Sequence, residues 1–325
     1  MSTNDRILPA TTTSPVAVLA LNPAVDISYE IPQLLADQKV RANKTYYHPG
    51  GNGINVARAL TELGVPLKCC STLGGRGGEW FLRLLGDDLR ESHHYIEVDG
   101  ETRVNVTLQQ KQPPSQYEVD SGGPYVADAT LDQIIDCFLE NAASGYAVLT
   151  GSTPPGVPDS TYAELSEQIC AQGGKAILDA HGKVLQLALE TKPFLLRTNR
   201  YVIEHLIKQR LNSIEAVARA ARDIQRKGTQ YVCISLGHEG AVMVDGDASY
   251  HCRSPRVRVS STVGCGDALL AGILSACIQH KGTEEMLRFG IACGSATASH
   301  PGTGLFTREE FENNEYELEV NALDI

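Results

Sequence analysis

The stretch YAVLTGSTPPGVPDSTYAELSEQICAQGGKAILDA, from Tyr146 to Ala180, contains two apolar runs separated by a helical pattern. The apolar runs, YAVLTG and KAILDA, are short and uninterrupted, as expected of strands buried on both faces. Between them, residues 160–174 carry apolar side chains at helical spacing and end on two glycines. A helix that joins two buried strands is the crossover unit of a parallel sheet.

The same alternation continues on both sides of this stretch. Further predicted strands cover residues 16–22, 67–73, 193–199 and 231–237, and further predicted helices cover residues 53–64, 78–89, 131–141 and 214–228. We therefore predict an α/β fold with a three-layer core, in which helices cover both faces of a mostly parallel sheet.

This alternation of strands and helices is interrupted by two segments, at about residues 26–48 and 101–121. The second contains TRVNVTLQ (Thr102–Gln109), whose period-two alternation suits a half-exposed antiparallel sheet. We predict that both segments form a small β-sheet that acts as a lid. The lid would belong to a single domain at residues 15–325, preceded by a disordered tail at residues 1–14.

Composition excludes several classes of function. The net charge of −11 disfavours nucleic-acid binding, which depends on Lys and Arg. No apolar run is long enough for a membrane span, and the N-terminus lacks the layout of a signal peptide. Nine cysteines without a CxxC motif indicate free thiols in a reducing compartment. We expect a cytoplasmic protein with no nucleic-acid or membrane partner.

The segment STVGCGDALLAGI (Ser261–Ile273) places an Asp between a glycine turn and an apolar helix. Gly264 and Gly266 allow backbone N–H groups to approach an anion, and the helix N-terminus adds positive potential. Asp267 would then accept a proton from a hydroxyl that attacks a phosphoryl group. The alternative is an ordinary Asp near the start of a buried helix.

A second glycine turn lies in HPGGNGINVARAL (His48–Leu60). A dinucleotide fingerprint would need an acidic residue about 20 positions downstream, and the stretch around CCSTLGG has none. A turn that lets Asn55 hydrogen-bond a polyol fits better. A close-packed helix start is the alternative.

The third segment, YVCISLGHEGAVMVD (Tyr231–Asp245), reads as a strand, a turn through Gly237 and Gly240, and a second strand. Ligands of α/β proteins commonly bind at the carboxyl ends of parallel strands. Taken alone, the segment predicts a β-hairpin with no ligand site.

Seven motifs occur in a fixed order between Val16 and Phe306: LNPAVD, GGNGINVARAL, GETRVNV, TGSTPPGV, TNRYVIEHL, ISLGHEGA and STVGCGDALLAG. Together they resemble the PfkB (ribokinase-like) carbohydrate kinase family. Within it, the pattern is most similar to 1-phosphofructokinase, 6-phosphofructokinase isozyme 2 and tagatose-6-phosphate kinase. The resemblance implies a ribokinase-like fold and transfer of the γ-phosphoryl group of ATP to a sugar hydroxyl, with Mg²⁺.

The resemblance also implies roles for individual residues. Asp267 matches the catalytic base, and the backbone of Gly264, Cys265 and Gly266 matches the anion hole. Matches to sugar-phosphate contacts are Asp26, Lys39, Gly50, Gly51, Asn55 and Arg103. Matches to nucleotide contacts are Asn199, Ser235, Gly237, Gly240 and Thr262.

One departure concerns the metal. The family usually reads K-P-N-x-x-E where this chain reads RTNRYV, so Val202 stands in place of a Glu that helps to hold magnesium. Glu204 cannot replace it, because two positions along a helix are about 200° apart. The metal ligand is therefore left unassigned.

A second departure is Cys265, which stands where Ala is common. A thiol at a helix N-terminus can have a lowered pKa and be oxidisable, which we take as a hypothesis.

The acceptor predicted from these motifs is a phosphorylated ketohexose, with fructose 1-phosphate the best single choice. SQYEVDSGGP (Ser115–Pro124) resembles a stretch of the 1-phosphofructokinase type, and Lys39 and Arg103 suit a phosphate group. Fructose 6-phosphate and tagatose 6-phosphate are alternatives, as is a sugar-phosphate-binding or regulatory protein with weak turnover. Open lid edges favour a homodimer.

Overall fold

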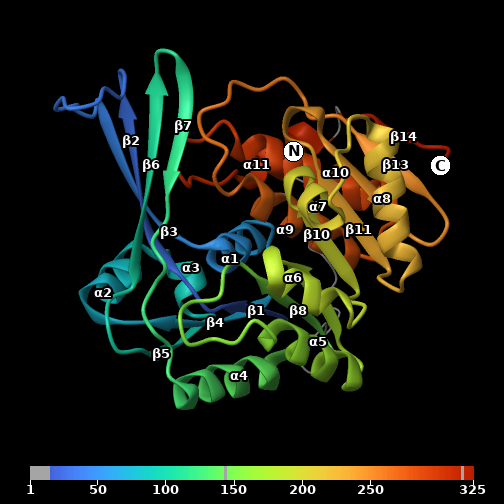
Figure 1. Ribbon diagram of the computed structural model, residues 1–325, viewed down its shortest axis with the longest axis horizontal. Coiled ribbons are helices and arrows are strands. Elements are labelled where there is room, and N and C mark those ends of the chain that lie inside the picture. Colours follow the sequence, from blue (N-terminus) through green and yellow to red (C-terminus); the bar gives the residue numbers. More distant parts are fainter. Residues whose placement is uncertain (1–14, 143–144, 316–317) are drawn as a thin grey trace, which may run out of the picture.

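The computed structural model describes residues 15–142, 145–315 and 318–325, and the predicted tail at residues 1–14 lies outside them. A large sheet with helices packed on it forms the main body, and a small sheet projects from one end (Figure 1). The α/β architecture predicted from the sequence, a mostly parallel sheet with a second, smaller sheet, is confirmed.

The large sheet has ten strands. Seven neighbouring strands are parallel, and in spatial order they are β5 (His93–Glu97), β4 (Leu67–Leu73), β1 (Val16–Ala20), β8 (Tyr146–Thr150), β9 (Lys175–Asp179), β10 (Leu195–Asn199) and β11 (Tyr231–Ser235). Three antiparallel strands extend the sheet beyond β11: β12 (Ala241–Val244), β13 (Ser249–Cys252) and β14 (Val320–Ala322). The mostly parallel sheet was predicted, whereas β5, β13 and β14 were not.

Strand β1 shows why helices cover both faces of this sheet. Val16 and Val18 contact one hydrophobic cluster, while Ala17 and Leu19 contact the other. All four side chains are buried, because successive strand residues point to opposite faces and both faces are covered. A strand of this kind has no polar face, which is why it appears in the sequence as an uninterrupted apolar run.

The helices divide between the two clusters. The first cluster includes residues of α1 (Asn52–Glu62), α2 (Gly75–Leu84), α3 (Asp87–Arg90), α9 (Cys265–Ile278), α10 (Thr283–Thr297) and α11 (Arg308–Glu315). The second includes residues of α4 (Asp128–Ala142), α5 (Thr161–Ala171), α6 (Gly182–Leu189), α7 (Arg200–Ile207) and α8 (Ile214–Arg226). Within the described parts of the chain, no helix has the length and apolarity needed to cross a bilayer.

The predicted helix at residues 78–89 is in fact two helices. Leu85 adopts an extended backbone conformation, with ψ of 126°, which ends α2 before α3 begins. The continuous helical spacing of apolar residues concealed this break.

The small sheet has the strand order β3 (Lys44–Gly50), β2 (Ala24–Ile31), β6 (Arg103–Lys111) and β7 (Pro114–Val119). Its central pair, β2 and β6, is parallel, although the alternating pattern predicted an antiparallel sheet. The register places His48 and Asn105 on either side of Asp26. The role of this sheet as a lid stays a prediction.

Tyr162 allows a test of the buried hydrogen bonding in the core. Its side chain is fully buried, and its hydroxyl donates to the carbonyl oxygen of Thr150 at 2.9 Å. Tyr162→Phe should lower the free energy of unfolding by about 1–3 kcal/mol, because a buried acceptor loses its donor. Tyr125→Phe makes the same chemical change on a side chain that is 63% exposed. Urea unfolding of both variants checks this, and equal stabilities would contradict it.

Candidate active site

The centre of the site is Asp267, the third residue of α9. Gly264 precedes this helix with φ of +80°, a conformation that residues with a side chain rarely adopt, and so turns the chain into the helix. The first amides of α9 have no acceptor within the helix and carry its positive end. The carboxylate is only 3% exposed.

Two amide side chains hold the Asp267 carboxylate. Asn52 Nδ2 donates to Oδ1, and Asn55 Nδ2 donates to Oδ2, each at 2.9 Å. Both asparagines lie at the start of α1, so the two glycine-rich turns seen in the sequence meet at one carboxylate. Asn55 was predicted to bind a polyol, whereas Asn52 was missed because it occupies the unassigned position between Gly51 and Gly53.

The pKa of Asp267 is raised to about 7, mainly by burial and secondly by the nearby Asp179 carboxylate. The hydrogen bonds from Asn55 and Asn52 and the charge of Arg197 oppose this shift. A carboxylate with a pKa near neutrality is well matched to accepting a proton at physiological pH.

Arg197, at the carboxyl end of β10, is a buried cation next to the helix start. Its Nη1 donates to Asp179 Oδ2 at 2.9 Å, and its Nη2 donates to Ser235 Oγ at 3.2 Å. A Cβ on Gly266 would lie 2.0 Å from Nη2, so the turn needs a residue without a side chain here. The guanidinium therefore joins the ends of three strands to the glycine turn.

A cavity of about 910 Å³ opens beside this turn. All the predicted nucleotide-contact residues line it, namely Asn199, Ser235, Gly237, Gly240 and Thr262, together with Cys265 and Gly266 of the predicted anion hole. Its volume suits a ligand of nucleotide size. Gly237 belongs to the short 3₁₀ turn η1 (Gly237–Glu239), which joins the antiparallel strands β11 and β12.

Sequence reasoning missed other residues that line this cavity, in particular His238, Arg253 and Arg256. Both arginines are exposed, and they lie in the segment between β13 and α9. They supply the local positive charge that an acidic chain needs in order to hold an anion. The basic run RSPRVR (Arg253–Arg258) was the available signal.

The predicted sugar contacts Asp26 and Gly50 lie together at the root of the small sheet. Asp26 is 5% exposed and accepts hydrogen bonds from Thr303 Oγ1 at 2.7 Å and Asn105 Nδ2 at 3.1 Å. A Cβ on Gly50 would lie 2.0 Å from Asp26 Oδ2, so only glycine leaves room for this carboxylate. Burial is the main cause that raises the pKa of Asp26.

Arg103 and Gly51 line a second, small cavity together with Asn52 and Ser152. Arg103 donates from Nη2 to the carbonyl oxygen of Asn22 at 2.9 Å, which holds its guanidinium at this cavity. Asn52, which lines this small cavity, donates to Asp267, and Gly266, which precedes Asp267, lines the large one.

Lys39 is not brought to either cavity. It is exposed in the segment that joins β2 to β3, and no ion pair links it to any described residue. Its predicted contact with a sugar phosphate therefore stays a prediction.

A model of the family described as "pfkB family carbohydrate kinase" matches residues 15–310. The chain belongs to this family. It is accordingly a phosphotransferase that uses ATP and an alcohol group as acceptor, as the motif order had indicated.

Relatives of this carbohydrate kinase cover most of its length. It is 29% identical to a 1-phosphofructokinase of Bacillus subtilis, over 87% of this chain and 92% of that protein. It is 31% identical to ATP-dependent 6-phosphofructokinase isozyme 2 of Escherichia coli, over 91% and 96% of the two chains. The structure of E. coli phosphofructokinase-2 with substrates and products is similar, with a TM-score of 0.88, 30% identity, and coverage of 93% and 99%.

The described side chains of this carbohydrate kinase do not form a binding site for the magnesium ion that its family implies. Val202 is apolar, and Asn199 Oδ1 accepts the Val202 N–H at 2.9 Å as the cap of α7. Glu204 binds Arg210 Nη1 and the Leu211 N–H instead. The described residues contain no group of three His, Cys, Asp or Glu side chains arranged to hold a metal.

The thiol of Cys265 does not have the lowered pKa that we hypothesised. Its pKa is raised to about 12, mainly by burial and secondly by the neighbouring Asp267 carboxylate. Loss of hydration raises the pKa of the buried thiol more than the positive end of α9 lowers it. Cys265 is therefore not a reactive thiol.

The raised pKa of Asp267 predicts a pH-dependent cost to stability. Between the unfolded value of 3.8 and about 7, the folded state holds a proton that the unfolded state has lost, so stability falls as pH rises. Asp267→Asn removes this titration. The melting temperature of the variant should therefore exceed that of the wild type by more at pH 8 than at pH 4, and a constant difference would contradict the assignment.

Proposed function

We propose that this protein is an ATP-dependent sugar-phosphate kinase that transfers the γ-phosphoryl group to a hydroxyl of a phosphorylated ketohexose, with fructose 1-phosphate as the favoured acceptor. One observation carries the proposal: the Asp267 carboxylate, held by Asn52 and Asn55 of α1, directly follows Cys265 and Gly266, which line a nucleotide-sized cavity. A phosphoryl donor in that cavity and an acceptor beside Asp26 and Arg103 would meet at this carboxylate.

The chemistry that follows is a single displacement. Asp267 accepts the proton of the acceptor hydroxyl, whose oxygen forms a bond to the γ-phosphorus while the bond from that phosphorus to the bridging oxygen of ADP breaks. The backbone N–H groups of Gly264, Cys265 and Gly266 would hold the charge of the transferring group. The preorganised amides and the positive end of α9 need no rearrangement during this step.

A phosphorylated acceptor is supported by the position of Arg103 at the small cavity. Guanidinium groups bind phosphate through short, charge-assisted hydrogen bonds. Lys39 would join this site only if the small sheet moved toward the core, as proposed for a lid. The names of the similar phosphofructokinases, which include both 1-phosphofructokinase and isozyme 2, support fructose phosphates as acceptors. Tagatose 6-phosphate is the further alternative.

A sugar-phosphate-binding protein with weak turnover is the second candidate function. The apolar Val202 at the expected metal position favours it, whereas the buried Asp267 carboxylate next to the glycine turn favours an enzyme, because binding alone needs no proton acceptor.

A coupled assay of ADP formation separates these functions. The wild type should turn over fructose 1-phosphate with a higher kcat/KM than fructose 6-phosphate, tagatose 6-phosphate or unphosphorylated fructose. Asp267→Ala should lose roughly 10²- to 10⁴-fold in kcat with little change in KM, the range typical of a positioned base. Near-normal turnover by this variant would refute the catalytic assignment, and no turnover of any acceptor by the wild type would refute the kinase.

We propose that Mg²⁺ arrives bound to the phosphates of ATP and keeps most of its waters, as this ion commonly does. Val202→Glu should then lower the Mg²⁺ concentration that gives half-maximal rate, because it restores the carboxylate that the family pattern has at this position. Calorimetry should detect tighter binding of ATP to the variant in the presence of Mg²⁺ and no change without it. Val202→Gln is the uncharged control, and identical magnesium titrations for Val202→Glu and wild type would contradict the proposal.

We further propose that the protein is cytoplasmic and forms a homodimer through the small sheet. The edge strands β3 and β7 carry Tyr47, Tyr117 and Val119, which are between 42% and 61% exposed. Open sheet edges with apolar side chains favour pairing with a second copy. Sedimentation of the purified protein measures this directly.

A further inference from the structure

The segment that connects α10 to α11, residues 298–307, contacts the acceptor side of the site, although no sequence motif pointed to it. Thr303 in this connection is fully buried. Its Oγ1 donates to Asp26 Oδ2 at 2.7 Å, while Asn105 Nδ2 donates to the other oxygen at 3.1 Å. The two bonds fix the plane of the Asp26 carboxylate.

The backbone of Thr303 is held as firmly as its side chain. Arg58 Nη1 donates to the Thr303 carbonyl oxygen at 3.0 Å and to the Pro49 carbonyl oxygen at 3.1 Å. Pro49 precedes Gly50, the residue packed against Asp26. Arg58 lies on α1 one turn after Asn55, which binds Asp267. The connection is thereby tied to the helix that holds the catalytic carboxylate.

The methyl group of Thr303 faces the anion-hole turn. A Cβ on Gly264 would lie 3.7 Å from Thr303 Cγ2 and 3.1 Å from Leu305 Cδ2. One side chain therefore contacts Asp26 with its hydroxyl and supports the start of α9 with its methyl group.

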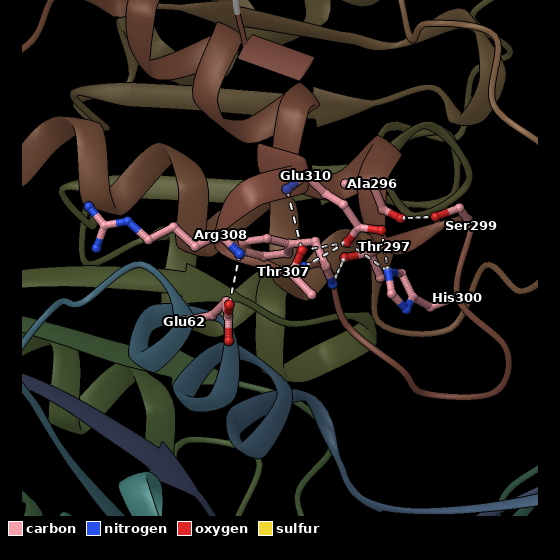
Figure 2. Close-up of polar contacts among 9 residues, drawn as sticks. Glu62, Ala296, Thr297, Ser299, His300, Thr307, Arg308 and Glu310 are labelled. Atoms are coloured by element: carbon pink, nitrogen blue, oxygen red, sulfur yellow. Dashed lines mark hydrogen bonds and ion pairs between the residues drawn. The ribbon is translucent and has the colours of Figure 1, made fainter. Parts of the chain in front are cut away.

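Both ends of the connection are fastened (Figure 2). His300 Nε2 pairs with Glu310 Oε2 at 2.8 Å, and the Thr307 N–H donates to the same oxygen at 2.8 Å. The Arg308 N–H donates to Glu62 Oε1 of α1 at 2.7 Å. Fixed ends restrict the path of the chain between them, which favours a single position for Thr303.

The surroundings of Asp26 are also built for a polar ligand. The buried Oδ1 atoms of Asn22 and Asn105 and the Oγ of Ser28 have no hydrogen-bond partner among the described residues. Buried polar atoms are nearly always paired, so these unpaired atoms, of which Asn105 also bonds Asp26, indicate contacts that a ligand or water completes.

We propose that Thr303 is a positioning residue for the acceptor: its hydroxyl orients Asp26 toward the sugar hydroxyls, and its methyl group supports the anion-hole turn. The inference rests on the proposed kinase function for the identity of the acceptor. It assigns the connection between α10 and α11 to the acceptor site as a third element, besides the small sheet and α1.

Two variants separate the two contacts of Thr303. Thr303→Val keeps a methyl group and removes the hydroxyl, so KM for fructose 1-phosphate should rise roughly 10- to 100-fold, as expected for a lost hydrogen bond to a charged group. KM for ATP should stay unchanged. Thr303→Ser restores the hydroxyl and should return KM for the sugar to within about threefold of the wild type, while its loss of the methyl group lowers kcat.

Thr307→Val is the matched control, because it removes a hydroxyl that caps α11 but keeps the bond from the Thr307 N–H to Glu310 that holds this end of the connection. It should lower the melting temperature without changing KM for the sugar. If Thr303→Val does not fold, Thr303→Cys replaces it. A thiol is a weak hydrogen-bond donor, so this variant should also raise KM for the sugar phosphate, but by a smaller factor.

The inference is overturned if Thr303→Val leaves KM for fructose 1-phosphate unchanged, if it raises both KM values equally, or if Thr303→Ser is as impaired as Thr303→Val. When the preferred acceptor in the panel is another ketohexose phosphate, that compound is the probe. Absence of any turnover by the wild type would instead refute the proposed function.

Discussion

The site depends on the burial of one carboxylate at the start of an apolar helix. Helix α9 buries nearly every residue from Asp267 to Cys277, so its position is fixed by packing on both sides. Burial would disfavour the charged form of Asp267 if nothing compensated for it. Amide donors from α1 and the charge of Arg197 provide that compensation, and they keep the carboxylate ionisable near neutral pH. The packing of α1 against α9 and the chemistry of Asp267 therefore depend on each other.

Charge around this carboxylate is balanced locally, although the chain as a whole carries −11. Arg197 pairs with Asp179 across neighbouring strand ends, and Arg58 and Arg103 each donate to backbone carbonyl groups. Parallel strands make this possible because their carboxyl ends meet at one edge of the sheet. The large cavity lies at that edge and the small sheet adjoins it, so donor and acceptor would approach Asp267 from different directions.

Much of this architecture was predictable from periodicity. The run LKCCSTL predicted β4 with the observed bounds, and every residue in it except Lys68 is buried, as expected of a strand covered on both faces. The break between α2 and α3 was missed although Gly86, the N-cap of α3, lies in it, because the apolar residues keep their helical spacing across the break. For Cys265, the position at a helix start was correct but its pKa was wrong, because desolvation depends on neighbours that are distant in the chain.

The sequence by itself determined the family, the main alternation of strands and helices, and the two glycine turns before α1 and α9, because these follow from local spacing and side-chain type. Only the tertiary structure decided which side chains meet at the site. Asn52 lies 215 positions from Asp267, and Thr303 lies 277 positions from Asp26. Contacts between such distant positions arise when packed helices and sheets bring them together, and no periodicity along the chain records them.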